Sequence, residues 1–196
     1  DFYQRISAGI LKGALLLILA VPLILSLRLS YLIYQNDSRV LLREWTEQNI
    51  PSGSKILVYA RLTRLPSSRE AIEEQRLLDP QSLRRVDAAE ANSTNRTGKF
   101  FHALNLYDVN NPEFYGNLEK YIRDNHYQYL FIGGTDIREA ERLERFQKIA
   151  DKGTLLKAFG EFQEIYSPSI GQLTGSPFYL FKLKEFGPPV AVYKLY

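Results

Sequence analysis

A run of apolar residues near the amino terminus constrains this chain more than any other feature. The sequence from Gly13 to Leu25 contains only apolar residues, glycine and proline, and further apolar residues follow as far as Ile33. A helix needs about 20 apolar residues to cross the hydrocarbon core of a bilayer. The stretch from Gly9 to Tyr34 meets that length, so it predicts one membrane-spanning helix.

Five residues of this stretch are expected to anchor the helix or to pack it against others: Lys12, Pro22, Arg28, Tyr31 and Tyr34. Lys12 and Arg28 lie near its two ends, where long side chains reach the headgroups. The two tyrosines are typical of an interfacial aromatic belt. The proline bends the span, a change that contacts with neighbouring helices can compensate.

Two other interpretations of the apolar stretch are less favourable. A secretory signal peptide has a shorter apolar region followed by small residues at a cleavage site, whereas Ser26-Leu27-Arg28 offers no such site. A buried core helix is usually apolar on one face, whereas this stretch is apolar all round. The sequence therefore favours an anchor over residues 1–35 and a separate domain over residues 36–196.

Composition excludes several kinds of site. The 196-residue chain has no cysteine, so disulfides, thiolate chemistry and cysteine-ligated metals are excluded. Its two histidines, His102 and His126, stand in no metal-ligand spacing, and we expect no metal and no cofactor. The net charge of +3 comes from basic and acidic residues that alternate along the chain, which gives no nucleic-acid footprint.

The remaining sequence predicts alternating helices and strands. Helices are expected over residues 36–49, 68–78 and 136–150, with another starting at Asn111-Pro112-Glu113. Strands are expected over six ranges, of which the last two would form a hairpin: 55–60, 100–104, 127–132, 155–162, 178–183 and 190–195. This order predicts an α/β fold, in which one transmembrane helix is followed by a small α/β sandwich with a mixed sheet.

Several helical faces can also be assigned. In the first helix of the domain, Val40, Leu41, Trp45 and Gln48 are expected along one side. In the helix after Asn111, the shared face comprises Phe114, Leu118, Tyr121 and Ile122. In the last helix, the inward residues are expected to be Ile137, Ala140, Leu143, Phe146 and Ile149.

No candidate catalytic constellation emerges. The segment Gly133-Gly134-Thr135-Asp136 joins a strand to a helix, but it lacks the glycine spacing of a phosphate-binding loop and is better explained as a helix cap. The carboxylate pairs Glu73/Glu74 and Glu161/Glu164 are interpreted as solvated faces. The aromatic residues in the segment 127–131 are interpreted as core. We therefore assign no catalytic residue.

A resemblance emerges from the two ends of the domain. It is carried by Asp37-Ser38-Arg39, by Trp45, by Asn49-Ile50-Pro51-x-Gly53-Ser54-Lys55-Ile56, and by Gly187-Pro188-x-Val190-x-Val192-Tyr193-Lys194-Leu195. Together with the span, these resemble the last membrane helix and C-terminal extracytoplasmic domain of bacterial GT-C glycosyltransferases of the protein-mannosyltransferase and aminoarabinose-transferase type. That family uses a polyprenyl-phosphate sugar donor, and its catalytic carboxylate lies in an early loop that no position here matches.

The resemblance implies an orientation that charge alone does not decide. Basic residues flank the span on both sides, including Arg5 and Lys12 before it and Arg39 and Arg43 after it. The resemblance places the region after Tyr34 outside the cytoplasm, on the periplasmic or extracellular side of a bacterial inner membrane.

Two functional classes follow from these observations. In the first, favoured here, the chain is a non-catalytic single-span subunit that binds or scaffolds a larger membrane protein complex through its extracytoplasmic domain. Its partners are then other membrane protein subunits and membrane lipid, with no nucleic acid. In the second, the chain is the C-terminal accessory domain of a polytopic GT-C glycosyltransferase.

Overall fold

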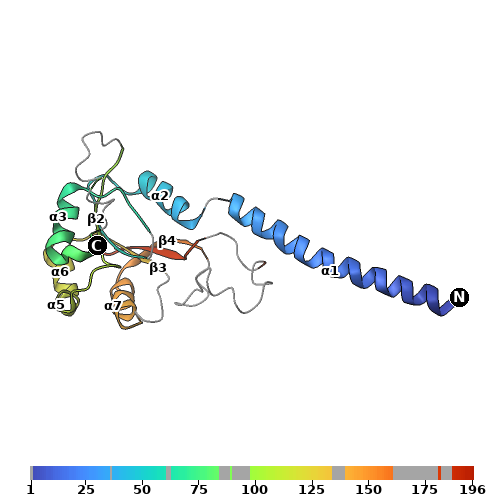
Figure 1. The fold of residues 1–196 in the computed structure, drawn as a ribbon. Helices are drawn as coiled ribbons and strands as arrows, with labels where there is room; N and C mark the ends of the chain where they lie inside the picture. Colours follow the sequence, from blue (N-terminus) through green and yellow to red (C-terminus); the bar gives the residue numbers. More distant parts are fainter. Residues whose placement is uncertain are drawn as a thin grey trace.

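A long helix extends from one end of a mixed α/β domain (Figure 1). The computed structural model describes residues 2–35, 37–60, 63–83, 89, 98–133, 140–160, 181 and 187–196. The elements follow one another in this order: α1 (Phe2–Tyr34), α2 (Ser38–Asn49), β1 (Lys55–Tyr59), α3 (Arg69–Leu78), η1 (Pro80–Ser82), β2 (His102–Asn105), α5 (Pro112–Gly116), α6 (Leu118–Asp124), β3 (Tyr129–Gly133), α7 (Ala140–Ala150), β4 (Thr154–Phe159) and β5 (Val190–Lys194).

The predicted amino-terminal helix is present and begins earlier than expected. Helix α1 is 33 residues long and continues through Pro22. Judged by length and composition, the helical stretch from Ile18 onward is long and apolar enough to cross a membrane. Only 6% of its most apolar part is buried. Leu16, Ile18 and Leu19 are each more than 60% exposed. A core helix would bury such side chains, because exposed apolar surface is unfavourable in water.

The domain is built on a five-stranded mixed sheet in the order β2-β1-β3-β5-β4. Strand β1 pairs in parallel with β2 and with β3, while β5 is antiparallel to both β3 and β4. The crossover that carries α3 joins β1 to β2, and the one that carries α5 and α6 joins β2 to β3. This confirms the predicted α/β class with a mixed sheet.

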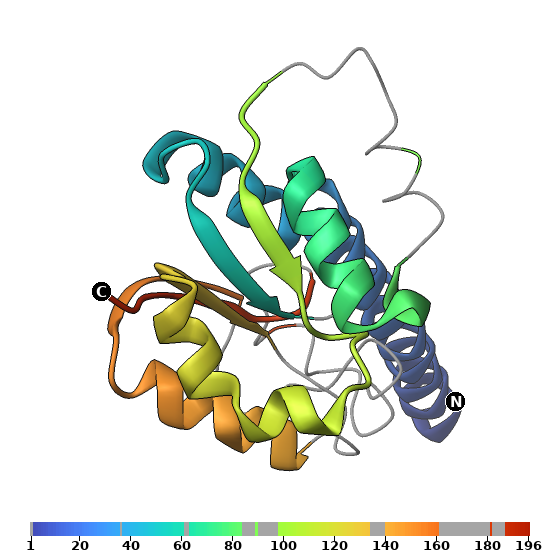
Figure 2. The same ribbon diagram turned by 90° about the vertical axis from the view of Figure 1, so that its left-hand side faces the viewer.

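Helices cover both faces of the sheet, so the domain has three layers (Figure 2). On one face, Leu57 and Leu130 pack against Phe114, Ile122 and Phe146 from α5, α6 and α7. On the other face, the buried strand residues, among them Ile56, Val58, Phe131 and Val192, pack against α2. The alternation along β1 follows from the two-residue period of a strand, in which successive side chains point to opposite faces.

The strand register defines two ends of the sheet. At one end, Val190 is paired with both Gly133 and Phe159, and this end adjoins the connection between α1 and α2 through contacts described below. At the other end, Lys55 is paired with His102, and Lys194 with Tyr129. These are called the junction end and the far end. The carboxyl ends of β1 and β3 therefore lie at the junction end, and their amino ends lie at the far end.

Two sequence predictions about helices need correction. In α2, the fully buried side chains are Ser38, Leu42 and Thr46, while Val40 and Gln48 are exposed and Trp45 is half-buried. The predicted face was half right. Leu41 and Trp45 are partly buried and pack against the core. The helix also turns its polar Ser38 and Thr46 inward, where the hydroxyl of Thr46 donates to the carbonyl of Leu42.

The helix predicted after Asn111 is interrupted at Asn117, which separates α5 from α6. Its inward face is confirmed nonetheless, since Phe114, Leu118 and Ile122 are buried. In α7, Leu143, Phe146 and Ile149 are likewise buried as predicted. The cap expected at Thr135 or Asp136, the inward Ile137 and, apart from residue 181, the strand expected over 178–183 lie outside the described residues.

Candidate functional site

The connection between α1 and the domain is stabilised by the first residues of α2. Asp37 caps the helix, since its Oδ1 accepts a hydrogen bond of 2.9 Å from the backbone N–H of Arg39. The guanidinium of Arg39 also pairs with the Asp37 carboxylate at 2.6 Å. Burial by itself raises the pKa of Asp37, but the hydrogen bonds from Arg39 outweigh it and lower that pKa. The carboxylate is therefore held in its ionised form, which suits a helix N-cap.

Ser38 connects this turn to the other end of the chain. Its buried hydroxyl donates a hydrogen bond of 2.7 Å to the carbonyl of Pro188, 150 residues away in sequence. Gly187 precedes this proline with a φ of +110°, a conformation that favours glycine. A Cβ at Gly187 would collide with the Ser38 hydroxyl and the Asp37 carboxylate. Close approach and backbone conformation thus both require glycine here.

Aromatic packing reinforces the same region. Trp45 of α2 meets Phe159 of β4 edge-on, with ring centroids 6.2 Å apart. Gly160 has a φ of +73° and lies so close to Pro189 that a Cβ would come within 2.9 Å of the proline Cα. The junction, defined here as Asp37, Ser38, Arg39, Gly187 and Pro188 with the Trp45–Phe159 pair, therefore fixes α2 on the sheet immediately after α1.

The five predicted anchor residues are spread along α1 and do not form one cluster. Lys12 and Pro22 are exposed, Tyr31 is 52% exposed, and Tyr34 is 90% exposed. Arg28 is half-buried, and its guanidinium lies over the ring of Tyr31 at 5.4 Å from the centroid. Only Arg28 and Tyr31 are thus brought together. The exposure of both tyrosines near the end of α1 suits contact with a membrane–water interface, where the ring lies among apolar groups and the hydroxyl faces water.

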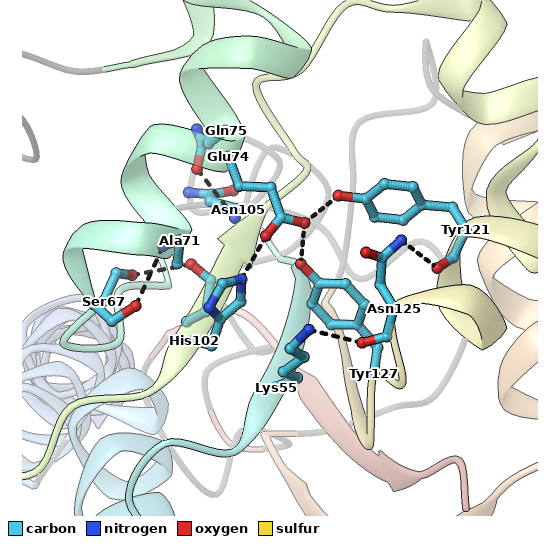
Figure 3. Close-up of polar contacts among 12 residues, drawn as sticks. Lys55, Ser67, Ala71, Glu74, Gln75, His102, Asn105, Tyr121, Asn125 and Tyr127 are labelled. Carbon is cyan, nitrogen blue, oxygen red and sulfur yellow. Dashed lines mark hydrogen bonds and ion pairs between the residues drawn. The ribbon is translucent and has the colours of Figure 1, made fainter.

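A second polar cluster lies at the far end of the sheet, around the carboxylate of Glu74 on α3 (Figure 3). Its Oε2 is 2.5 Å from Nε2 of His102 on β2. Its Oε1 accepts hydrogen bonds from the hydroxyl of Tyr127, at 2.6 Å, and from the hydroxyl of Tyr121 on α6. Both carboxylate oxygens are therefore occupied by groups of the chain itself.

The electrostatics of this cluster favour an ionised carboxylate. Burial by itself raises the pKa of Glu74, but hydrogen bonds from His102 and from the two tyrosines lower it to about 2. Burial and the Glu74 carboxylate raise the pKa of both Tyr121 and Tyr127, which keeps the phenols protonated as donors. A carboxylate with so low a pKa is a poor proton acceptor at neutral pH. The cluster acts as a clamp that ties α3 to β2 and α6.

Lys55 extends the clamp to β1. Its Nζ donates a hydrogen bond of 2.9 Å to the carbonyl of Asn125 and lies 5.7 Å from the ring centroid of Tyr127. Tyr127 is fully buried, so its aromatic ring separates the cation from the carboxylate at its hydroxyl end. The prediction that this aromatic segment fills the core is confirmed for Tyr127 and Phe131.

The interpretation of Glu73 and Glu74 as one solvated pair was wrong. Glu73 faces solvent and pairs with Arg76, whereas the side chain of Glu74 is only 24% exposed. The two histidines also differ, because His102 joins the clamp, while His126 is exposed in a turn with a φ of +56°. The i, i+4 spacing of Glu74 with Leu78, which packs on the core, was the available signal that Glu74 lies on the inner side of α3.

Other candidate groups are not assembled into a site in the described part of the chain. Ala60, directly after β1, lies against Gly133, the last residue of β3, since a Cβ at Gly133 would come within 2.6 Å of the Ala60 Cβ. The rest of the segment Gly133-Gly134-Thr135-Asp136 and the pair Glu161/Glu164 lie outside the described residues. Among the residues that the structure describes, no group of three or more side chains is placed to hold a metal ion.

Comparisons of the chain with protein-family models, with curated proteins and with solved structures found no match.

Proposed function

We propose that this chain is a membrane-anchored, non-catalytic module that binds or scaffolds a larger membrane protein complex through its extracytoplasmic domain. The observation that carries the proposal is the junction. The exposed apolar helix α1 is followed within a few residues by α2, whose N-cap Asp37 accepts from Arg39 and whose buried Ser38 hydroxyl bonds the carbonyl of Pro188, just before β5. An anchor joined in this way holds the domain next to the membrane surface, which suits a scaffold better than a flexible tether would.

The anchor itself supports contacts with other membrane proteins. An ionised arginine facing lipid at the bilayer centre costs about 2.5 to 3.5 kcal/mol on insertion scales, and far less at the interface or against protein. Arg28 lies six residues before Tyr34, at the end of α1 next to the domain. We infer that it sits at headgroup level, beside the helices of a partner, with Tyr31 and Tyr34 in the interfacial belt.

Affinity purification of the full chain in mild detergent, followed by mass spectrometry, tests this proposal. We expect other membrane subunits to co-purify, and their yield to fall when Arg28→Leu is introduced. Lys12→Leu is the matched control, because it removes a cation at the other end of α1, away from the domain, and should leave the yield unchanged. Recovery of the chain alone, with neither substitution altering the result, would contradict the proposal.

A second candidate is favoured by one specific observation. The residues that carry the resemblance to the C-terminal domain of GT-C glycosyltransferases come from opposite ends of the sequence, yet Ser38 and Pro188 are hydrogen-bonded and Gly187 is packed against both Asp37 and Ser38. These positions thus share a structural role. In this candidate, the domain is an accessory part of a polytopic enzyme that uses a polyprenyl-phosphate sugar, and the catalytic carboxylate lies elsewhere in that enzyme.

Intact-mass measurement of the native polypeptide separates the two candidates. A mass close to that of 196 residues supports a single-span subunit, whereas the mass of a polytopic protein supports the accessory domain. In either case, the domain acts by contact and not by chemistry, so substitutions at the junction should alter assembly before they alter any reaction.

A further inference from the structure

A pocket lies beside the clamp. The helices that line it, α3, α5 and α6, lie at the end of the domain away from α1 (Figure 1). It has a volume of about 240 Å³ and lies between the end of α3 and the pair α5 and α6. Its lining comprises Leu78, Asn111, Glu113, Phe114, Asn117 and Tyr121. Sites for small molecules and cofactors are usually larger, at about 300 to 1,000 Å³. The volume therefore suits a single side chain better than a cofactor.

Among the residues that line this pocket, Glu113 alone carries a charge. Glu113 is exposed at its rim, and within the described residues no cation pairs with its carboxylate. The two asparagine side chains are engaged within the protein: Asn111 bonds the N–H of Phe114 and the carbonyl of Leu78, and Asn117 donates to the carbonyl of Glu113. The carboxylate of Glu113 is thus the charged group available to an incoming side chain.

The aromatic wall adds to this preference for a cation. Phe114 and Tyr121 meet edge-on, with ring centroids 4.9 Å apart. The Tyr121 hydroxyl donates a hydrogen bond to the ionised carboxylate of Glu74. This hydrogen bond increases the electron density of the Tyr121 ring. Tyr127 stacks on one face of this ring, with ring centroids 5.9 Å apart, so a cation would approach the opposite face. An electron-rich ring attracts cations to its face, and arginine makes such contacts more often than lysine. The domain already uses this contact nearby, where the guanidinium of Arg142 lies 4.9 Å from the ring centroid of Tyr115.

We infer that this pocket binds an arginine side chain from the extracytoplasmic segment of a partner protein. The aliphatic stem would pack against Leu78 and Phe114, and the planar guanidinium would reach the ring of Tyr121 and the carboxylate of Glu113. Arginine fits better than lysine because its flat, weakly hydrated head stacks on aromatic rings while it also binds a carboxylate. This inference rests on the proposed binding function and adds the chemistry of the partner residue.

Peptide titration of the full chain in detergent micelles tests the inference, with backbone amide NMR signals as the readout. The probes are acetyl-Gly-Arg-Gly-amide and the same tripeptide with Lys or Leu in the middle. We expect saturable shifts confined to residues 111–121 with the arginine peptide, at least threefold weaker binding of the lysine peptide, and weaker binding still of the leucine peptide. Equal binding of all three peptides, or an equal or stronger response to leucine, would overturn the inference.

Two variants locate the contact. Glu113→Gln should weaken binding of the arginine peptide about threefold, the range expected when one exposed ion pair is lost. Asp124→Asn is the matched control, because it removes the same charge from an exposed position on α6 outside the pocket and should leave binding unchanged. Unchanged binding in Glu113→Gln would overturn the inference. The titration needs no native partner, so its failure would leave the purification experiment on the proposed function unaffected.

Discussion

At the junction end of the sheet a neutral hydroxyl bonds a carbonyl, whereas at the far end an ionised carboxylate collects three donors. Both contacts join segments that are distant in sequence, but they respond differently to change. The hydrogen bond of Ser38 contributes a modest free energy that does not vary with pH. The clamp around Glu74 contains a charged carboxylate. Removing that carboxylate leaves several donors unsatisfied, and the strength of the clamp depends on the ionisation of Glu74. The Ser38 contact therefore positions the domain, whereas the Glu74 clamp stabilises it.

The largest expected effect is at the clamp. Glu74→Ala removes the acceptor of three donors and should lower the free energy of unfolding by about 3 kcal/mol, because hydrogen bonds to charged groups are the strong ones. Chemical denaturation of the full chain in detergent, followed by circular dichroism, measures this change. Glu73→Ala, on the neighbouring exposed position, should change stability by less than about 0.5 kcal/mol. Equal effects of the two substitutions would show that the clamp does not stabilise the fold.

Acid should weaken the clamp within a defined pH range. The pKa of Glu74 falls from 4.5 to about 2 in the folded state, so the unfolded chain binds the proton first as pH decreases. The stabilisation from this carboxylate is therefore complete above about pH 5 and is lost progressively as pH falls towards 2. The difference in free energy of unfolding between the unchanged protein and Glu74→Gln should shrink over that range. A difference that stayed constant down to pH 2 would rule out this linkage.

A smaller effect is expected from crowding the junction. Gly187→Ala places a Cβ against Ser38 and Asp37 and strains a backbone with a φ of +110°. We expect the free energy of unfolding to fall by about 2 kcal/mol, since alanine at a positive φ is destabilising even without a collision. Fluorescence of Trp45, the single tryptophan of the chain, reports locally on this region. Gly98→Ala is the control, because its φ of +102° imposes similar strain while a Cβ there meets nothing within 4 Å.

The smallest effect should follow from Ser38→Ala. This substitution removes one neutral hydrogen bond and should lower the free energy of unfolding by about 1 kcal/mol. Because no charge is involved, the loss should be the same at pH 4 and pH 7. Ser52→Ala removes an exposed hydrogen bond of similar type, to the carbonyl of Phe100, and should cost less. A pH-dependent loss in Ser38→Ala would show that this hydrogen bond is coupled to a titrating group, of which the Asp37 carboxylate in the same junction is the nearest described here.

The same contrast explains how much the sequence could predict. The helices over 38–49 and 69–78 and the strand over 55–59 depend on neighbouring residues, and local patterns predicted them to within two residues at each end. The clamp depends on Glu74 meeting tyrosines that lie 47 and 53 residues further along the chain. In the sequence, charge alone does not distinguish Glu73 from Glu74. Only the packing of α3 beside β2 and α6 makes one of them an acceptor for the core.

The sheet order was likewise beyond local patterns. The predicted strand over 190–195 is present, but its position between β3 and β4 follows from how the whole sheet assembles. The hairpin expected with residues 178–183 involves residues outside those described. For the anchor, periodicity and length predicted a helix, while its contacts with lipid or partners remain predictions.

The position of β5 between β3 and β4 has a consequence for how the domain is made. Among the strands that the structure describes, β4 bonds only to β5, and β3 meets β4 only through β5, so this part of the sheet stays divided until residues 190–194 have left the ribosome. Non-local strand pairing of this kind is slow, because a long loop is closed before its contacts form. Until β5 has been made, β4 therefore lacks the strand it pairs with, and a chaperone that covers it during that interval would favour correct folding.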